Sequence, residues 1–153
     1  MIQPRDDTKP KHEPFKIRSD MLALDEYLKI FILPQVPAEY KEFRDEMRVA
    51  MGQSWRALLS AAVTTGRTRQ KHLVDLKVNM ALVEVYLHEV RDVCYRGKEK
   101  RKLDKNSLRR FENCAKLQKA VMTTVWGWAR NEDKKLDSSK TQKTAGLVEK
   151  EEV

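Results

Sequence analysis

The sequence predicts an all-α protein, an antiparallel up-down four-helix bundle. Of its 153 residues, 35% are charged and 41% hydrophobic, with only 5 Gly and 5 Pro, a composition that favours long helices. Apolar residues recur at steps of three and four in four segments, and their short connections favour antiparallel neighbours. The bundle is expected over residues 19–131. The flanking residues 1–18 and 132–153 have too few apolar side chains to offset chain entropy and are expected to be disordered tails.

The first helix is expected at residues 19–33, where Ser19 or Asp20 is a candidate N-cap. Its apolar stripe consists of Met21, Leu24, Leu28 and Phe31. Pro34 and Pro37 end this helix and force a tight connection, because proline cannot continue a helix interior.

The second helix is expected at residues 38–65 and stops at Gly66. Its stripe consists of Tyr40, Phe43, Met47, Met51, Trp55, Leu58 and Ala62. The third helix, residues 68–95, has the most regular seam, with Gly97 as its expected C-terminal cap. The seam consists of Leu73, Leu76, Met80, Val83, Leu87, Val90 and Cys94.

The fourth helix is expected at residues 104–130, with Asp104 as its N-cap. Its stripe consists of Leu108, Phe111, Ala115, Met122, Val125 and Ala129. Gln118 interrupts this stripe, because a polar amide stands where the pattern calls for an apolar side chain.

The chain is expected to be cytoplasmic and not bound to a membrane. No stretch approaches the roughly 18 apolar residues that a membrane span needs, and the polar N-terminus does not have the apolar region of a signal peptide. Cys94 and Cys114 fall inside helical patterns without the spacing of a disulfide framework, so we expect reduced core residues.

The predicted bundle carries nearly all the positive charge. The net charge is +8, to which residues 1–18 contribute +2 and residues 132–153 contribute −1. Residues 95–110 are the densest stretch, with eight Lys or Arg. Fixed positive charge attracts anions, so this stretch is either a contact for nucleic acid or an acidic partner, or a solvated loop. The candidate contacts are Arg67, Arg69 and Lys71 at one end and Arg96, Lys98, Lys100, Arg101, Lys102, Lys105, Arg109 and Arg110 at the other.

The residues do not support an enzyme, and we expect neither a cofactor nor a metal. Glu84 and His88, at i, i+4, could place two metal ligands on one face, but a solvent-facing pair is the simpler interpretation. No acidic residue stands three positions before a His, as a di-iron bundle requires. The five glycines are scattered singly and form no phosphate-binding loop, and no GxSxG elbow is present.

Two tryptophans indicate an oligomer interface. Trp126 and Trp128 are two residues apart, so on a helix their side chains point about 200° from each other. One can fill the core while the other either lies on a neighbouring helix or meets another chain, where tryptophan is enriched at anchor positions. The third helix adds apolar surface beyond its seam at Val74, Val78, Val85 and Tyr86. Tyr86, Trp126 and Trp128 are therefore the interface candidates.

Three segments together resemble a known family. They are the proline-marked break "YLKIFILPQVPAEYKEF", the apolar third helix "KHLVDLKVNMALVEVYLHEV" and the ending "VWGWAR". They are similar to the accessory variability determinant family, the small basic four-helix proteins of diversity-generating retroelements. The likeness covers residues 19–131.

This resemblance implies a homopentameric barrel that associates with a reverse transcriptase, binds RNA and DNA, and supports mutagenic copying of a template repeat. It implies an accessory protein that is not an enzyme. Relatives tend to carry Arg at i, i+4 where Glu84 and His88 align, so the nucleic-acid contact is expected at the basic turn instead. The alternatives are a four-helix protein–protein adaptor without a direct nucleic-acid role and a metal-dependent bundle enzyme.

Overall fold

The computed structural model describes the backbone of residues 13–100 and 105–152 and the side chains of residues 15–93 and 106–138. Every element in these residues is helical, and the predicted all-α class with four main helices is confirmed. The elements are α1 (Glu13–Tyr27), the π-helical turn η3 (Leu28–Ile32), the 3-10 turns η4 (Leu33–Gln35) and η5 (Ala38–Tyr40), α2 (Lys41–Val63), α3 (Gly66–Lys100) and α4 (Lys105–Glu152).

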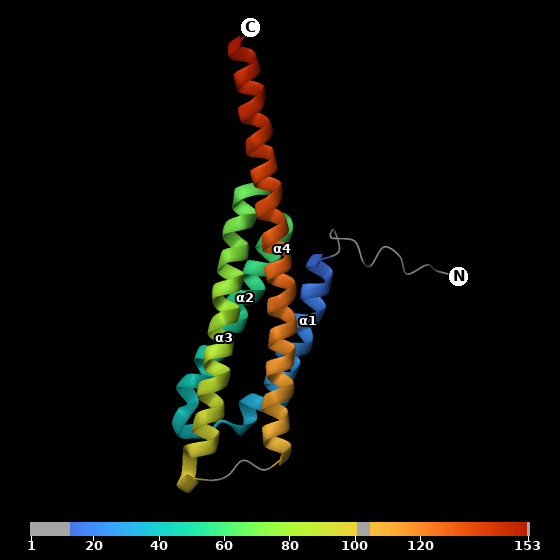
Figure 1. Ribbon diagram of the computed structural model, residues 1–153. Helices are drawn as coiled ribbons and strands as arrows, with labels where there is room; N and C mark the ends of the chain where they lie inside the picture. Colours follow the sequence, from blue (N-terminus) through green and yellow to red (C-terminus); the bar gives the residue numbers. More distant parts are fainter. Residues whose placement is uncertain (1–12, 101–104, 153) are drawn as a thin grey trace, which may run out of the picture.

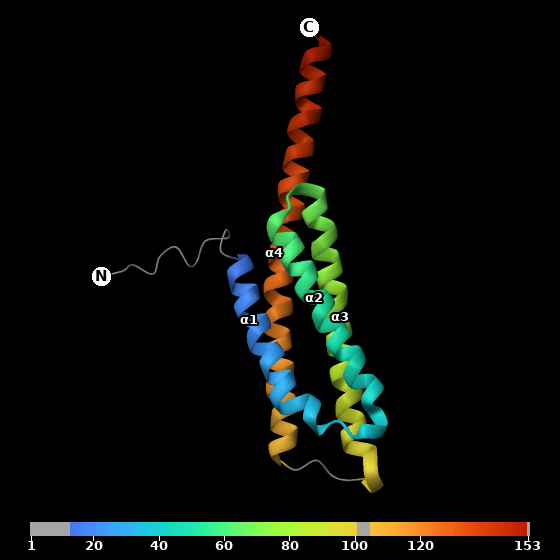
Figure 2. The same cartoon turned by 180° about the vertical axis from the view of Figure 1, so that it is seen from behind.

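The main helices lie along one another. In Figure 1 the chain runs down through α1, up through α2, down through α3 and up through α4, and Figure 2 shows the same path from behind. α2 packs mainly on α3, α3 on α4 and α4 on α1, whereas α1 and α2 touch each other only sparsely. The turns η4 and η5 lie at the same end as the last turn of α3, and the α2–α3 turn lies at the opposite end (Figure 1).

The core forms where the predicted stripes meet. The described members of the α3 seam are all buried, as predicted: Leu73, Leu76, Met80, Val83, Leu87 and Val90. The same apolar cluster includes Met47, Met51 and Leu58 of α2. Gly66 joins α2 to α3 with a φ of +60°, a left-handed conformation that glycine adopts without steric cost.

The first helix begins earlier than predicted. α1 starts at Glu13, so Ser19 lies inside the helix and does not cap it. Ile17 is fully buried, although the sequence placed it in a disordered tail. The reason is its register, because Ile17 stands four residues before Met21 and therefore extends the same buried stripe.

The end of the first stripe is shifted by one residue. Phe31 is 36% exposed, contrary to the prediction, and Ile32 is buried in its place. The cause is the π-helical turn η3, whose wider turn takes an extra residue and rotates the following side chains. Pro34 then lies in η4, and Pro37 directly precedes η5.

Two predicted positions in the middle helices are also wrong. Ala62 is exposed and Ala61 is buried instead, because α2 presents Ala57, Leu58 and Ala61 to the core. α3 continues past Gly97 to Lys100, since a single glycine weakens a helix by only about 1 kcal/mol. The predicted N-cap Asp104 and the side chain of Cys94 lie outside the described residues.

The buried face of α4 contains two polar side chains. Phe111, Cys114, Gln118, Val121, Val125, Trp128 and Glu132 follow one another there at alternating steps of three and four, and Ala129 is buried as predicted. Ala115 is exposed, contrary to the prediction, and Gln118 is buried within the stripe that it appeared to interrupt. α4 runs to Glu152, so the folded chain extends beyond the predicted boundary at residue 131. Among the described residues, no helix combines the length and the apolar content needed to cross a membrane.

Candidate nucleic-acid interface

The basic turn predicted as the main contact lies outside the described side chains. This applies to Arg96, Lys98, Lys100, Arg101, Lys102 and Lys105. The remaining predicted cations have described side chains and fall into two groups, Arg67, Arg69 and Lys71 on α3, and Arg109 and Arg110 on α4.

The two described groups lie at opposite ends of the bundle. Arg69 contacts Glu132 of α4, which is 22 residues further along α4 than Arg110. At about 1.5 Å of rise per residue, this separates the two groups by about 33 Å. The predicted α3 and α4 cations therefore do not form one local patch.

Arg69 is engaged inside the chain. Its Nη1 lies 2.8 Å from Oε1 of Glu132, and its Nε donates to the carbonyl of Ala61 at 2.9 Å. Its guanidinium also lies over the ring of Trp128, 5.4 Å from the centroid. Glu132 is buried and accepts a further hydrogen bond from Nε1 of Trp128 at 3.3 Å, so this cluster fastens α2, α3 and α4 together. Arg69 is therefore not available to an external anion.

The other described candidates differ in accessibility. Arg110 is half-buried and lies over the ring of Phe31, 5.4 Å from the centroid, where it helps to pack α4 on η3. Arg67, Lys71 and Arg109 are exposed. These three are available to an external anion.

The solvent-facing side of α4 carries a row of cations. All five side chains are exposed, and in the described part of the chain none takes part in an ion pair or hydrogen bond. We name them the α4 row: Arg109, Lys116, Lys119, Arg130 and Lys134. At 100° per residue they fall within an arc of about 80°, and from Arg109 to Lys134 they extend about 38 Å.

Small side chains separate the two halves of the α4 row. Thr123 and Gly127 occupy the same arc, and around Gly127 no atom lies within 4 Å of the place where a Cβ would stand. A phosphate backbone could therefore approach the helix closely at this point. Two exposed carboxylates, Glu112 and Asp137, share the arc near its ends. They offset two of the five positive charges, so the arc as a whole keeps a net positive charge.

The α4 row connects the two basic ends. Gln70 donates a hydrogen bond to Asp133, which places the next residues, Lys71 and Lys134, at the same level of the bundle. The row begins at Arg109, beside the basic turn. Sequence reasoning followed contiguous charge and so missed four of its members, although Arg109, Lys116 and Arg130 fall at multiples of seven, a spacing that a helical projection reveals.

The tryptophan pair divides as predicted between core and surface. Trp128 is 3% exposed and lies inside its own chain, so it is not available to an interface. Trp126 is 49% exposed, with Nζ of Lys77 4.2 Å from its ring centroid. Tyr86 is half-buried and donates to Oε2 of Glu46 at 3.2 Å, and this hydrogen bond raises the pKa of Tyr86. Exposed apolar residues run along α3 beyond its seam: Val74, Val78, Leu82 and Val85.

Groups with catalytic potential do not converge in the described residues. Burial raises the pKa of the Cys114 thiol to about 12, so it stays protonated and non-nucleophilic at neutral pH. Glu84 and His88 are both exposed. In the described part of the chain, no three His, Cys, Asp or Glu side chains are grouped so that they could hold a metal ion.

Comparison of the chain with models of protein families, with curated proteins and with solved structures finds no match in any of the three.

Proposed function

We propose that this chain is a non-enzymatic accessory protein of a diversity-generating retroelement, which binds nucleic acid and a reverse transcriptase to support mutagenic copying of a template repeat. The α4 row carries the nucleic-acid part of this proposal, because it presents five cations without described partners along one exposed face. The reverse transcriptase and the retroelement rest on the sequence resemblance.

The chemistry of the α4 row fits a phosphate backbone without base readout. Each Lys or Arg that neutralises a phosphate releases counterions, which favours binding at low salt. Proteins that bind single strands without sequence preference also stack bases on aromatic side chains. The described part of the α4 arc contains no aromatic residue, and Lys77 covers one side of the nearby Trp126 ring. We therefore expect affinity for RNA and DNA with little sequence preference.

Assembly is the second part of the proposal. Val74, Val78 and Val85 of α3 and Trp126 of α4 are each about half exposed, and they are the side chains that another protomer would cover. The resemblance implies that the protomer is an antiparallel up-down bundle and that the assembly is a homopentameric barrel. Such a barrel would repeat each basic surface around its axis.

Light scattering at moderately high salt tests the assembly. Five chains of 17.9 kDa give about 90 kDa. A mass near that value supports the barrel, and a mass near 18 kDa removes it. The variant Trp126→Ala would shift the mass downward if this surface is the interface.

Charge-matched variants test the nucleic-acid surface. The row variant replaces Lys116, Lys119, Arg130 and Lys134 with Gln. The control variant replaces Arg18, Lys41, Arg56 and Arg91 with Gln, all of them exposed and scattered over the other helices. Fluorescence anisotropy with a 20-nucleotide RNA should show at least about a tenfold loss for the row variant and a clearly smaller loss for the control. Equal losses would mean that net charge, and not the row, causes binding.

The protein–protein adaptor is distinguished by nuclease treatment. Treated pull-downs with a co-expressed reverse transcriptase retain the partner with unchanged affinity if the chain is an adaptor. A complex bridged by nucleic acid loses it. Elemental analysis of the purified protein tests the metal-enzyme alternative.

A further inference from the structure

A groove opens where α1 and α2 pack sparsely. Its cavity has a volume of about 230 Å³. The floor is apolar and consists of Leu28, Leu33, Met47 and Met51, all of which are buried. Methionine side chains are flexible and adapt to varied apolar partners, so this floor suits an inserted apolar side chain.

Gly52 keeps the α2 wall of the groove low. It lines the cavity on an exposed face of α2, and no atom lies within 4 Å of the place where its Cβ would stand. A glycine in a helix interior costs stability relative to alanine. Nothing within the described chain uses the space that this glycine leaves open.

The acidic group at the groove has partners within the chain, whereas the basic groups of α2 there have none described. Asp25 is neutralised within the chain, because Nζ of Lys29 lies 3.2 Å from Oδ2 and Nε1 of Trp55 donates to the same oxygen at 3.4 Å. Arg48 stands exposed at the cavity and forms no described ion pair. One turn earlier, Nε of Arg44 is buried and has no hydrogen-bond partner. Arg48 thus offers an exposed guanidinium at the cavity itself, and the half-buried Arg44 stands one helical turn beyond the cavity lining.

The α2 edge has the length of a short helix. Arg44, Arg48, Gly52, Trp55 and Leu59 follow one another at steps of three and four, so they share one face over about 22 Å. The edge is basic at its start and apolar at its end, where Leu59 is 55% exposed.

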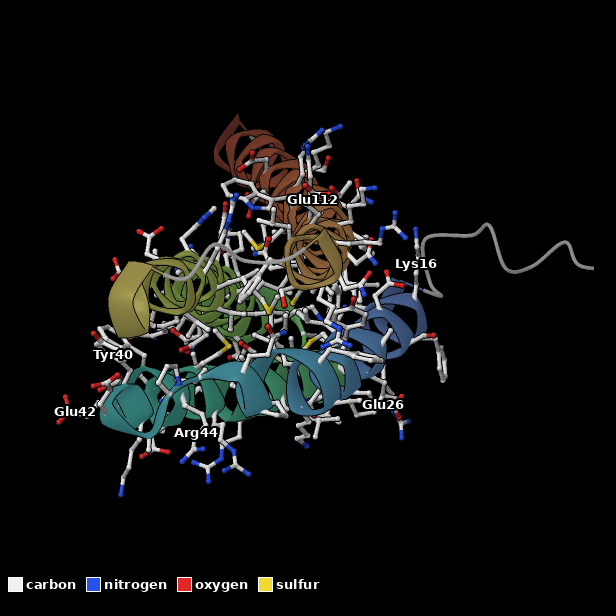
Figure 3. The ribbon with its side chains drawn as sticks, turned by 90° about the horizontal axis from the view of Figure 1, so that it is seen from below. Lys16, Glu26, Tyr40, Glu42, Arg44 and Glu112 are labelled. Carbon is white, nitrogen blue, oxygen red and sulfur yellow. The ribbon has the colours of Figure 1, made fainter. Side chains whose placement is uncertain are left out.

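We propose that this groove binds an acidic amphipathic helix of a partner protein. The apolar side of that helix lies on the leucine and methionine floor, and its carboxylates pair with Arg44 and Arg48. A nucleic-acid backbone has no apolar side chain to insert into this cavity, whereas an amphipathic helix does. The groove is also separate from the proposed nucleic-acid surface, since Figure 3 shows Arg44 of α2 and Glu112 of α4 on opposite sides of the bundle.

The three tryptophans of the full-length chain provide a test with internal controls. Trp55 lines the groove, whereas Trp126 lies towards α3 and Trp128 in the core. In 5-fluorotryptophan-labelled protein each gives one ¹⁹F signal. The probe is a 14-residue peptide made of two Leu-Glu-Glu-Leu-Leu-Glu-Glu repeats. We expect it to shift the Trp55 signal and leave the other two in place.

Two variants and one peptide locate the contact. Arg44→Glu combined with Arg48→Glu should weaken peptide binding at least tenfold. Gly52→Leu should fill the groove and abolish the Trp55 shift, and because it replaces an exposed helical glycine it should fold normally, as unchanged Trp128 and Trp126 signals would show. A peptide with Lys in place of every Glu should not bind.

Four results would overturn the proposal. The first is the absence of any Trp55 shift with the acidic peptide. The second is equal binding of the lysine peptide, which would exclude charge complementarity. The third is a Trp55 shift caused by the 20-nucleotide RNA, which would assign the groove to nucleic acid. The fourth is a Trp55 shift that depends on protein concentration alone, which would assign the groove to a second copy of the chain.

Discussion

α4 carries charged groups on two faces, and the two faces differ in what those groups do. On the inner face, Glu132 is buried and held by Arg69 and Trp128. On the outer face, the α4 row has no described partner. Arg69 and Lys71 show the same contrast two residues apart on α3, since one is held by Glu132 and the other is exposed. The role of a charge therefore follows from its partners and not from its residue type.

The inner cluster should give the largest effect. Arg69→Ala removes the close cation and leaves the buried Glu132 with only the hydrogen bond from Trp128 and the longer contact of Lys135 at 3.6 Å. Breaking a buried pair in this way costs about 3 kcal/mol, which urea unfolding would measure as a lower midpoint. The control is Arg69→Met combined with Glu132→Leu, which removes both charges and should recover much of the loss. If Arg69→Ala left the midpoint unchanged, the cluster would not hold the helices together.

Gln118 should give the next largest effect. Its Nε2 donates to the carbonyl of Met80 at 3.1 Å, so Gln118→Ala loses a buried hydrogen bond and leaves a cavity. We expect a loss of about 2 kcal/mol in the free energy of unfolding. Gln118→Leu keeps most of the volume and should cost less. An equal loss for both variants would indicate that the hydrogen bond, and not packing, dominates.

These polar core positions show where sequence reasoning succeeds and fails. The α3 seam from Leu73 to Val90 was predicted correctly because every third or fourth residue is apolar. Gln118 and Glu132 continue the same spacing on α4, but an apolar pattern treats them as interruptions, since their partners come from another helix. The π-helical turn that exchanges Phe31 for Ile32 also depends on packing that no local pattern encodes.

The candidate site was predicted less completely than the fold. Arg67, Lys71 and Arg109 were predicted and are exposed, whereas Arg69 needed the structure to reveal Glu132 as its partner. The α4 row could have been found from helical spacing. The α1–α2 groove could not, because it depends on how two helices separate in space.

Lys71 is an exposed counterpart to the paired Arg69 on the same helix. Lys71→Ala removes an exposed cation, so the free energy of unfolding should change by no more than about 0.5 kcal/mol. The affinity of the Lys71→Ala protein for RNA should fall a few-fold, because Lys71 lies at the same level of the bundle as Lys134 of the α4 row. Urea unfolding and anisotropy on the same preparation measure both. A larger effect on stability than on binding would place Lys71 in the same class as Arg69.

The smallest effect should come from Tyr86. Its hydrogen bond to Glu46 raises its folded pKa, so the bond's contribution to stability is complete below the ordinary pKa of tyrosine and is lost as pH rises through the folded value. Glu46→Gln should therefore lower the pKa of Tyr86, as ¹³Cζ chemical shifts would show, and slightly lower stability at pH 7, because the amide oxygen still accepts the bond but without its charge. An unchanged pKa of Tyr86 in this variant would mean that the Glu46 bond does not cause the shift.

The most direct test of the α4 row is the salt dependence of RNA binding. Anisotropy with the 20-nucleotide RNA, measured from about 50 to about 300 mM KCl, gives the slope of the logarithm of the binding constant against the logarithm of the salt concentration. Replacing Lys116, Lys119, Arg130 and Lys134 with Gln should make this slope shallower by about 2 to 3, at roughly 0.7 per phosphate contact on a single strand. A slope that stays the same in the row variant would contradict the account and place the nucleic-acid contact elsewhere on the protein.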